Sequence, residues 1–212
     1  MFPRGTRSIA VALLALLLAC AGPARAADAL PALLVLGDSV SAGYGLPAGK
    51  GWVTLLDARL KSDGYRYTVV NASISGDTTA GGRARLPALL AQHKPAVVVI
   101  ELGGNDALRG GNLAATRANL DSIVTAAQDA KARVMIVGMQ LPSNYGPAYV
   151  KDFSALFGDV AKAKRVPLVP AFFAGFGEDL ALFQPDRIHP TAEAQTKLLD
   201  NVWPTLQPLL RK

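Results

Sequence analysis

The sequence predicts one α/β domain in which a five-stranded parallel sheet lies between two layers of helices, a three-layer α/β/α sandwich. The prediction rests on two observations: five short apolar runs recur along the chain, and helical stretches separate them. Four of the runs are rich in Val, Ile and Leu with little polar alternation, which is typical of strands buried on both faces of a parallel sheet. Alternation of strand and helix then gives a doubly wound sheet that is covered on both faces.

Each expected element has its own run of residues. Strands are expected at 33–38, 67–73, 96–104, 133–139 and 166–172. Helices are expected at 52–64, 83–93, 113–131 and 148–164, where apolar residues recur at the spacing of one helical face. A last helix should begin near Thr191, and Pro204 should end or kink it, because proline cannot donate a backbone hydrogen bond.

Residues 1–26 have the features of a secretory signal peptide that precedes a single domain over 27–212. Two arginines near the start are followed by an unbroken apolar run of 11 residues at 9–19, and "ARA" at 24–26 fits a cleavage site. The apolar run is shorter than the about 20 residues of a bilayer-spanning helix. The expected location is therefore periplasmic or secreted. An acylated lipoprotein cysteine at Cys20, which ends an "LLAC" box, remains the alternative.

Charge and composition argue against a nucleic-acid partner and against a bound metal or cofactor. The chain carries 22 Lys and Arg against 16 Asp and Glu, and three of these arginines belong to the expected signal peptide. No basic stripe interleaved with aromatic residues is present, which argues against a nucleic-acid partner. The single cysteine precedes the domain and no cluster of metal-ligand residues is present, so neither a metal nor another cofactor is expected.

Polar residues gather just after the predicted strands. Ser39 follows the first strand, Gly76 lies in the loop after the second, Asn105 follows the third, and Asp186 and His189 come after the fifth strand and a loop. In an open α/β sheet the ligand crevice lies outside the carboxyl ends of the strands. These residues are therefore expected at one edge, whereas His93, which precedes a strand, is expected at the opposite edge.

Ser39 has two interpretations when it is considered alone. A serine between a strand and a helix usually caps the helix by accepting a backbone N–H. The alternative is a nucleophile, and it needs a base with an orienting partner. His189 and Asp186 supply that pair, because a carboxylate three residues before a histidine can reach the near ring nitrogen and hold its tautomer. A surface loop in which Asp186 caps the final helix is the competing interpretation of these two residues.

Four blocks of the sequence together resemble the GDSL, or SGNH, hydrolase family. They are "GDSVSAGYG", "NASISGDTT", "ELGGND" and "DRIHP", and they occur in the family's order across nearly the whole domain. The blocks "RLPALL" and "LPSNYG" resemble the periplasmic group of multifunctional thioesterases, arylesterases and lysophospholipases within it. The resemblance implies a flavodoxin-like fold and hydrolysis of acyl esters and thioesters.

The resemblance also implies a role for individual residues. It makes Ser39 the nucleophile, His189 the base and Asp186 the acid that orients it. The Ser39 N–H, the Gly76 N–H and the Asn105 side-chain amide would form the oxyanion hole. These types suit the chemistry, because a tetrahedral oxyanion needs donors aimed at it and an asparagine amide donates without acting as an acid.

The acyl chain is expected to lie along two loops. Residues 78–82 and 141–146 should line an acyl groove, with Leu141, Pro142 and Tyr145 as its apolar surface. The substrate is then a small-molecule acyl ester or thioester, and the enzyme is expected to be a monomer that makes transient contact with lipid. A carbohydrate O-acetylesterase of the same family is one alternative. A non-catalytic flavodoxin-like protein that binds an anion at the helix after Gly37 is the other.

Three further residues stand out against the family pattern. Ser41 lies two residues after Ser39 and is a rival nucleophile of lower rank, because the family's nucleophile matches Ser39. Glu101 is unusual in an apolar strand, and it is expected to brace the loops around Asn105. Arg187 stands where the family usually has glycine, and it points either to solvent or to an anionic group of a substrate.

Overall fold

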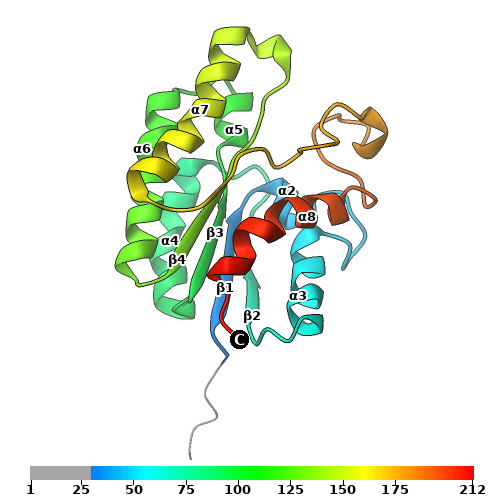
Figure 1. Cartoon of the computed structure of the whole chain (residues 1–212). Helices are drawn as coiled ribbons and strands as arrows, with labels where there is room; N and C mark the ends of the chain where they lie inside the picture. The colour runs from blue at the N-terminus through cyan, green and yellow to red at the C-terminus, as the bar shows by residue number, and fades with distance from the viewer. Residues whose placement is uncertain (1–29) are drawn as a thin grey trace, which may run out of the picture. The chain divides into compact units, whose positions relative to one another are not determined.

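The computed structural model describes residues 30–212, and in them five parallel strands form one sheet (Figure 1). The strand order is β2-β1-β3-β4-β5. The bounds are β1 Ala32–Gly37, β2 Thr68–Asn71, β3 Val97–Glu101, β4 Arg133–Val137 and β5 Leu168–Val169. The predicted five-stranded parallel sheet is confirmed, with the strand order of flavodoxin-like folds. The expected signal peptide and Cys20 lie outside the described residues.

Helices cover both faces of the sheet (Figure 1). On one face lie α3 (Trp52–Ser62) and α8 (Gln195–Leu206); on the other lie α4 (Thr79–His93), α6 (Leu113–Asp129) and α7 (Pro147–Lys164). Two short helices, α2 (Ser39–Ala42) and α5 (Gly104–Leu108), and three 3-10 turns, η1 (Ser143–Tyr145), η2 (Leu180–Leu182) and η3 (Gln207–Leu209), complete the described elements. Within residues 30–212, none of the helices combines the length and apolarity needed to cross a bilayer.

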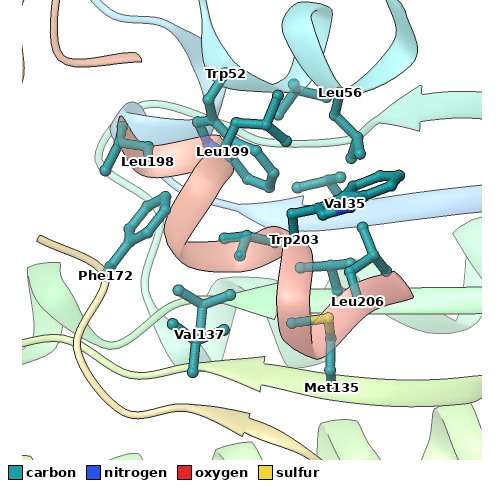
Figure 2. Close-up of a cluster of buried hydrophobic side chains, with 14 of the residues drawn as sticks. Val35, Trp52, Leu56, Met135, Val137, Phe172, Leu198, Leu199, Trp203 and Leu206 are labelled. Carbon is teal, nitrogen blue, oxygen red and sulfur yellow. The ribbon is translucent and has the colours of Figure 1, made fainter. Parts of the chain in front are cut away.

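A separate apolar core lies on each face of the sheet, between the strands and the helices that cover them. Alternate residues of a strand point to opposite faces, so Val35 of β1 belongs to the core under α3 and α8, and Leu34 to the core under α4, α6 and α7. Figure 2 shows the first of these cores, in which Trp52, Trp203 and Leu206 pack with the strand side chains. All three side chains are buried in this core.

Two predicted boundaries were wrong for local reasons. The strand expected at 166–172 shrinks to two residues, because prolines at 167 and 170 cannot donate to the sheet. Helix α4 begins earlier than predicted, at Thr79, because the Thr78 side chain caps it by accepting the Gly81 N–H at 3.2 Å. Pro204 does not end α8, which continues to the buried Leu206.

The sheet topology fixes where a ligand can bind. Strand β1 lies between β2 and β3, so the connections leaving β1 and β2 run to opposite sides and the strand order reverses there. Such a reversal leaves the carboxyl ends of the neighbouring strands uncovered. Ser39 follows β1 and Asn105 follows β3, so both lie at this point.

Candidate active site

Ser39 does not cap the helix that it begins. Asp38 is the cap residue of α2, and its Oδ1 accepts the Val40 N–H at 3.0 Å. The Ser39 side chain is thereby left for another partner, and its Oγ lies 2.8 Å from Nε2 of His189. The serine is nearly buried, with 9 % of its surface exposed, and it lines a cleft.

The other ring nitrogen of His189 lies against Asp186. Nδ1 is 2.7 Å from Oδ2 of Asp186, whose Oδ1 accepts the backbone N–H groups of Ile188 at 2.9 Å and His189 at 3.0 Å. Partial burial raises the pKa of Asp186, but these hydrogen bonds and the imidazole outweigh it and lower the pKa below its ordinary value. Asp186 is therefore a stable anion that orients the imidazole, and it does not cap α8, which begins at Gln195.

The turn that carries His189 is held by a side chain that the sequence did not single out. Gln184 donates its backbone N–H to the His189 carbonyl at 2.8 Å, and its Nε2 donates to the carbonyls of Tyr44 at 2.8 Å and Pro190 at 3.2 Å. The Tyr44 ring lies 4.6 Å from the imidazole, centroid to centroid. The two contacts of Tyr44, with Gln184 and with His189, join positions more than 130 residues apart, so no local pattern reveals them.

The backbone at Arg187 has the conformation that favours the glycine found here in the family that the sequence resembles. Its φ is +58°, in the left-handed region where a side chain is unfavourable and glycine is not. The hydrogen bonds that Asp186 accepts from the two following amides hold the turn in this shape. The exposed Arg187 lies at the cleft.

Gly76 occupies a turn that requires its conformation. The Asp77 N–H donates to the Ile74 carbonyl at 3.1 Å, and Gly76 has φ +79° at the third position, as in a type II turn. The Ile74 N–H donates to the Gly37 carbonyl at 3.1 Å, which ties the turn to the end of β1. Gly76 lines the same cleft as Ser39.

Asn105 is aimed by the carboxyl group that caps α2. Its Nδ2 donates to Oδ2 of Asp38 at 3.2 Å, and the residue lines the cleft. A side-chain amide has two N–H groups, so one serves this hydrogen bond and the second is available to a ligand.

Ser41 and Glu101 form a buried pair behind the turn that carries Ser39. The Ser41 hydroxyl donates to Oε2 of Glu101 at 2.5 Å and accepts the Trp52 Nε1–H at 3.2 Å. The Asp38 N–H also faces Oε2 of Glu101, at 3.4 Å. Glu101 thus braces the turn that carries Ser39, and it reaches Asn105 only through Asp38. Ser41 is buried and absent from the lining of the cleft that contains Ser39.

Burial perturbs both carboxyl groups beneath the site. Desolvation raises the pKa of Asp38 to about 6, although the Val40 amide, His189 and Asn105 lower it. Desolvation, followed by the nearby Asp38, raises the pKa of Glu101 well above its ordinary value. The two groups therefore resist carrying two negative charges at once.

Residues 78–82 do not line the groove, contrary to expectation. They form the cap and first turn of α4, and none of them lies among the residues around the cleft. Asp106 fastens this turn, because its carboxylate accepts the Thr79 N–H at 2.9 Å and the Thr79 hydroxyl at 2.6 Å. In their place Ser75 and Gly76 face the cleft.

The cleft has a volume of about 1550 Å³ and two apolar walls. Leu141, Pro142 and Tyr145 lie along one wall, where the sequence places the acyl groove. The other wall, which the sequence analysis missed, comes from the segment between β5 and His189 and includes Phe173 and Phe183. Within the described part of the chain, no three His, Cys, Asp or Glu side chains gather as metal ligands would.

Comparison with known proteins gives a match over most of the chain. Residues 35–197 match the GDSL-like lipase/acylhydrolase family. Among curated proteins, the chain is 57 % identical to esterase TesA of Pseudomonas aeruginosa over 84 % of this chain and 89 % of the relative. It is 44 % identical to thioesterase 1/protease 1/lysophospholipase L1 of Escherichia coli K12 over 87 % of each chain.

A solved structure agrees with the fold. The psychrotrophic esterase EstA of a Pseudoalteromonas species, inhibited by monoethylphosphonate, has a TM-score of 0.79 and 36 % sequence identity. The alignment covers 84 % of this chain and 97 % of that one.

The stability of Asp38→Asn relative to the wild type should rise between acidic and neutral pH. The native pKa of about 6 lies above the roughly 3.9 of an unfolded aspartate, so between these values the native state binds the proton more tightly. The wild type therefore loses stability as the pH rises through this window, whereas an asparagine keeps the cap and stays neutral. Urea unfolding should show the variant gaining about 1–3 kcal/mol on the wild type between pH 4 and pH 7.

The matched control is Asp159→Asn, because that carboxylate lies in an exposed ion pair with Arg117. Its difference from the wild type should stay within about 0.5 kcal/mol at both pH values. An equal change in the Asp38 variant at pH 4 and pH 7 would contradict the prediction.

Proposed function

This chain belongs to the GDSL-like lipase/acylhydrolase family and is a carboxylic ester hydrolase, and from that premise we propose that it cleaves acyl esters and thioesters through an acyl-enzyme on Ser39. The observation that carries the proposal is the chain of two short contacts, Ser39 Oγ to His189 Nε2 at 2.8 Å and His189 Nδ1 to Asp186 at 2.7 Å. The enzyme class excludes the non-catalytic binding protein that the sequence left open.

In the first half of the reaction His189 Nε2 takes the Ser39 proton as Oγ attacks the carbonyl carbon. Asp186 keeps the proton of Nδ1 facing itself and stabilises the imidazolium that forms. The tetrahedral intermediate collapses when His189 returns the proton to the departing alcohol or thiol. In the second half a water molecule, deprotonated by His189, attacks the acyl-enzyme and releases the acid.

The negative charge of the intermediate needs donors from three loops. The Ser39 N–H lies in the first turn of α2, where backbone N–H groups have no partner within the helix. The Gly76 N–H is not used by the hydrogen bond that closes its turn, and Asn105 has a second amide proton. Each donor in such a hole contributes about 10²–10³ to kcat.

The size of the cleft favours long acyl groups over acetyl. A cleft of about 1550 Å³ with apolar residues on both walls accommodates a chain of many methylenes, whereas an acetyl group contacts only its centre. The names of the two curated relatives, an esterase and a thioesterase/lysophospholipase, support the same choice. This argues against the carbohydrate O-acetylesterase, although that enzyme would use the same catalytic groups.

The experiment that tests the function is a panel of p-nitrophenyl esters and acyl thioesters graded from acetyl to palmitoyl. Each methylene buried along the groove should raise kcat/KM about fourfold until the groove is full, from roughly 0.8 kcal/mol per methylene. Acetylated xylo-oligosaccharides are the comparison substrate. A preference for them, or for acetyl esters, would favour the O-acetylesterase.

Replacing Ser39 with alanine should lower kcat on the order of 10⁴-fold on every substrate of that panel. A fluorophosphonate should label the wild type at Ser39 and leave Ser39→Ala unlabelled. Ser41→Ala is the matched control: it should keep the label and most of its kcat, and lose stability because Glu101 and Trp52 lose a shared partner. Labelling that maps to Ser41 would reverse the assignment.

Transient contact with lipid is also part of the proposed function. Of the five large apolar side chains that are exposed in residues 30–212, four lie at or beside the mouth of the cleft: Tyr44, Ile74, Leu180 and Ile188. An exposed apolar patch of this kind marks an interaction surface, and a lipid surface is where long acyl esters are found.

The double substitution Leu180→Ser and Ile188→Ser tests this contact. In a Ser39→Ala background, where turnover does not interfere, it should reduce several-fold the fraction that sediments with phosphatidylcholine vesicles. Leu30→Ser is the control, since Leu30 is also an exposed leucine and precedes β1 in the sequence by two residues. Unchanged sedimentation of the double variant would remove lipid from the proposal.

The enzyme is further proposed to act as a monomer in the periplasm after cleavage behind Ala26. The composition of residues 1–26 supports the export and the cleavage. Protein isolated from the periplasm should begin near Ala27 and scatter light with the mass of one chain. An acylated Cys20 at its N-terminus would show that it is a lipoprotein instead.

A further inference from the structure

Arg85 is a largely buried cation that the proposed reaction does not use. It lies in the second turn of α4, and 20 % of its side chain is exposed. Its guanidinium donates to three acceptors: Nε to Oδ2 of Asp77 at 2.8 Å, Nη2 to the Gly37 carbonyl at 3.3 Å, and Nη1 to the Ala72 carbonyl.

We infer that Arg85 is a positioning residue that holds the Gly76 turn against the nucleophile turn, so that the oxyanion donors of the two loops converge. The three acceptors lie in the two segments that Arg85 would join. Gly37 is the last residue of β1, immediately before the turn that carries Ser39. Ala72 directly follows β2, and Asp77 directly follows Gly76, so both ends of the loop are bound.

Asp77 is itself held by hydrogen bonds, so the position of its contact with Arg85 is fixed. Its Oδ1 accepts the Thr78 N–H at 2.9 Å, and its side chain lies over the first turn of α4. A side chain at Gly81 would meet this carboxylate, because a Cβ there would lie 2.0 Å from Oδ1 of Asp77. The ion pair with Arg85 is shielded, with 20 % and 11 % of the two side chains exposed.

Arginine suits this place and lysine does not. The guanidinium presents N–H groups in a planar fork, and here they reach a carboxylate and two carbonyls, one at the end of β1 and one just after β2. An ammonium group is a single point on a flexible stem and cannot span the three acceptors together. The charge would be retained in a lysine variant while the geometry would be lost.

Because the Ser39 and Gly76 N–H groups come from separate loops, their distance depends on what joins the loops. A displacement of about 1 Å at a reacting centre can cost about 10²-fold in rate. The oxyanion forms only after attack, so the loss should appear in kcat and not in KM. This inference rests on the proposed function, in which Ser39 is acylated.

The test compares Arg85→Lys and Arg85→Ala with the wild type, each corrected for active sites by fluorophosphonate titration. Arg85→Lys should lower kcat about 10–100-fold with KM changed less than about threefold, and the rate of phosphonylation should fall by a similar factor. Asn105→Ala supplies the reference pattern, a fall of about 10²–10³ in kcat with little change in KM. Guanidinium ion at tens of millimolar should restore part of the rate of Arg85→Ala.

Two substitutions control for charge and for an ordinary ion pair. Arg83→Lys changes an exposed arginine on the same helix, and Arg117→Lys changes the arginine of the exposed pair with Asp159. Neither should alter kcat, and guanidinium should not accelerate Arg83→Ala.

A purely structural Arg85 would lower the melting temperature and leave kcat per titrated site intact, which would overturn the inference. So would a rise in KM alone, or no rescue of a folded Arg85→Ala. If Arg85→Ala does not fold, Arg85→Lys decides by its kcat. Failure of the proposed function is seen separately, as a wild type that the fluorophosphonate does not label at Ser39.

Discussion

The rest of the site depends on the two hydrogen bonds that the Asp38 carboxylate accepts. One oxygen starts the helix of Ser39 by accepting the Val40 N–H, and the other aims the Asn105 amide. A single side chain at the end of β1 therefore frees the serine from capping and places a donor that comes from the end of β3. Glu101 supports Asp38 by facing its backbone N–H, so two buried carboxyl groups that repel each other lie beside the turn that carries Ser39.

Two kinds of contact hold the rest of the site around Asp38: contacts within a single turn, and contacts between segments that are distant in the sequence. Asp186 and His189 lie three residues apart. Their turn is held by the hydrogen bonds that Asp186 accepts from the backbone amides of Ile188 and His189. The Gly76 turn is joined to β1 through the Ile74 amide and through Arg85. The topology of the sheet brings these pieces together, because β1 and β3 are neighbours whose carboxyl ends are left uncovered.

The sequence could predict the features that depend on local patterns, and it could not predict those that depend on contacts between distant segments. Buried strands such as 133–137 were found because their pattern is local, and the aspartate three residues before His189 was found for the same reason. Helix boundaries failed where one residue overrides the pattern, as Thr78 does in capping α4. The roles of Tyr44, Arg85 and the aromatic wall could not be predicted, because they arise from contacts between distant segments that only the folded chain creates.

Arg187 has a consequence for how the protein can diversify. The left-handed backbone there is imposed by the two amides bound to Asp186, so the shape of the turn does not depend on the side chain that position 187 carries. A side chain in this conformation costs roughly 1–2 kcal/mol relative to glycine, which the fold tolerates. The position is a mutable contact at the entrance, one residue from the acid of the proposed triad, where charge or bulk can be exchanged over evolutionary time while the bond-breaking chemistry is inherited unchanged.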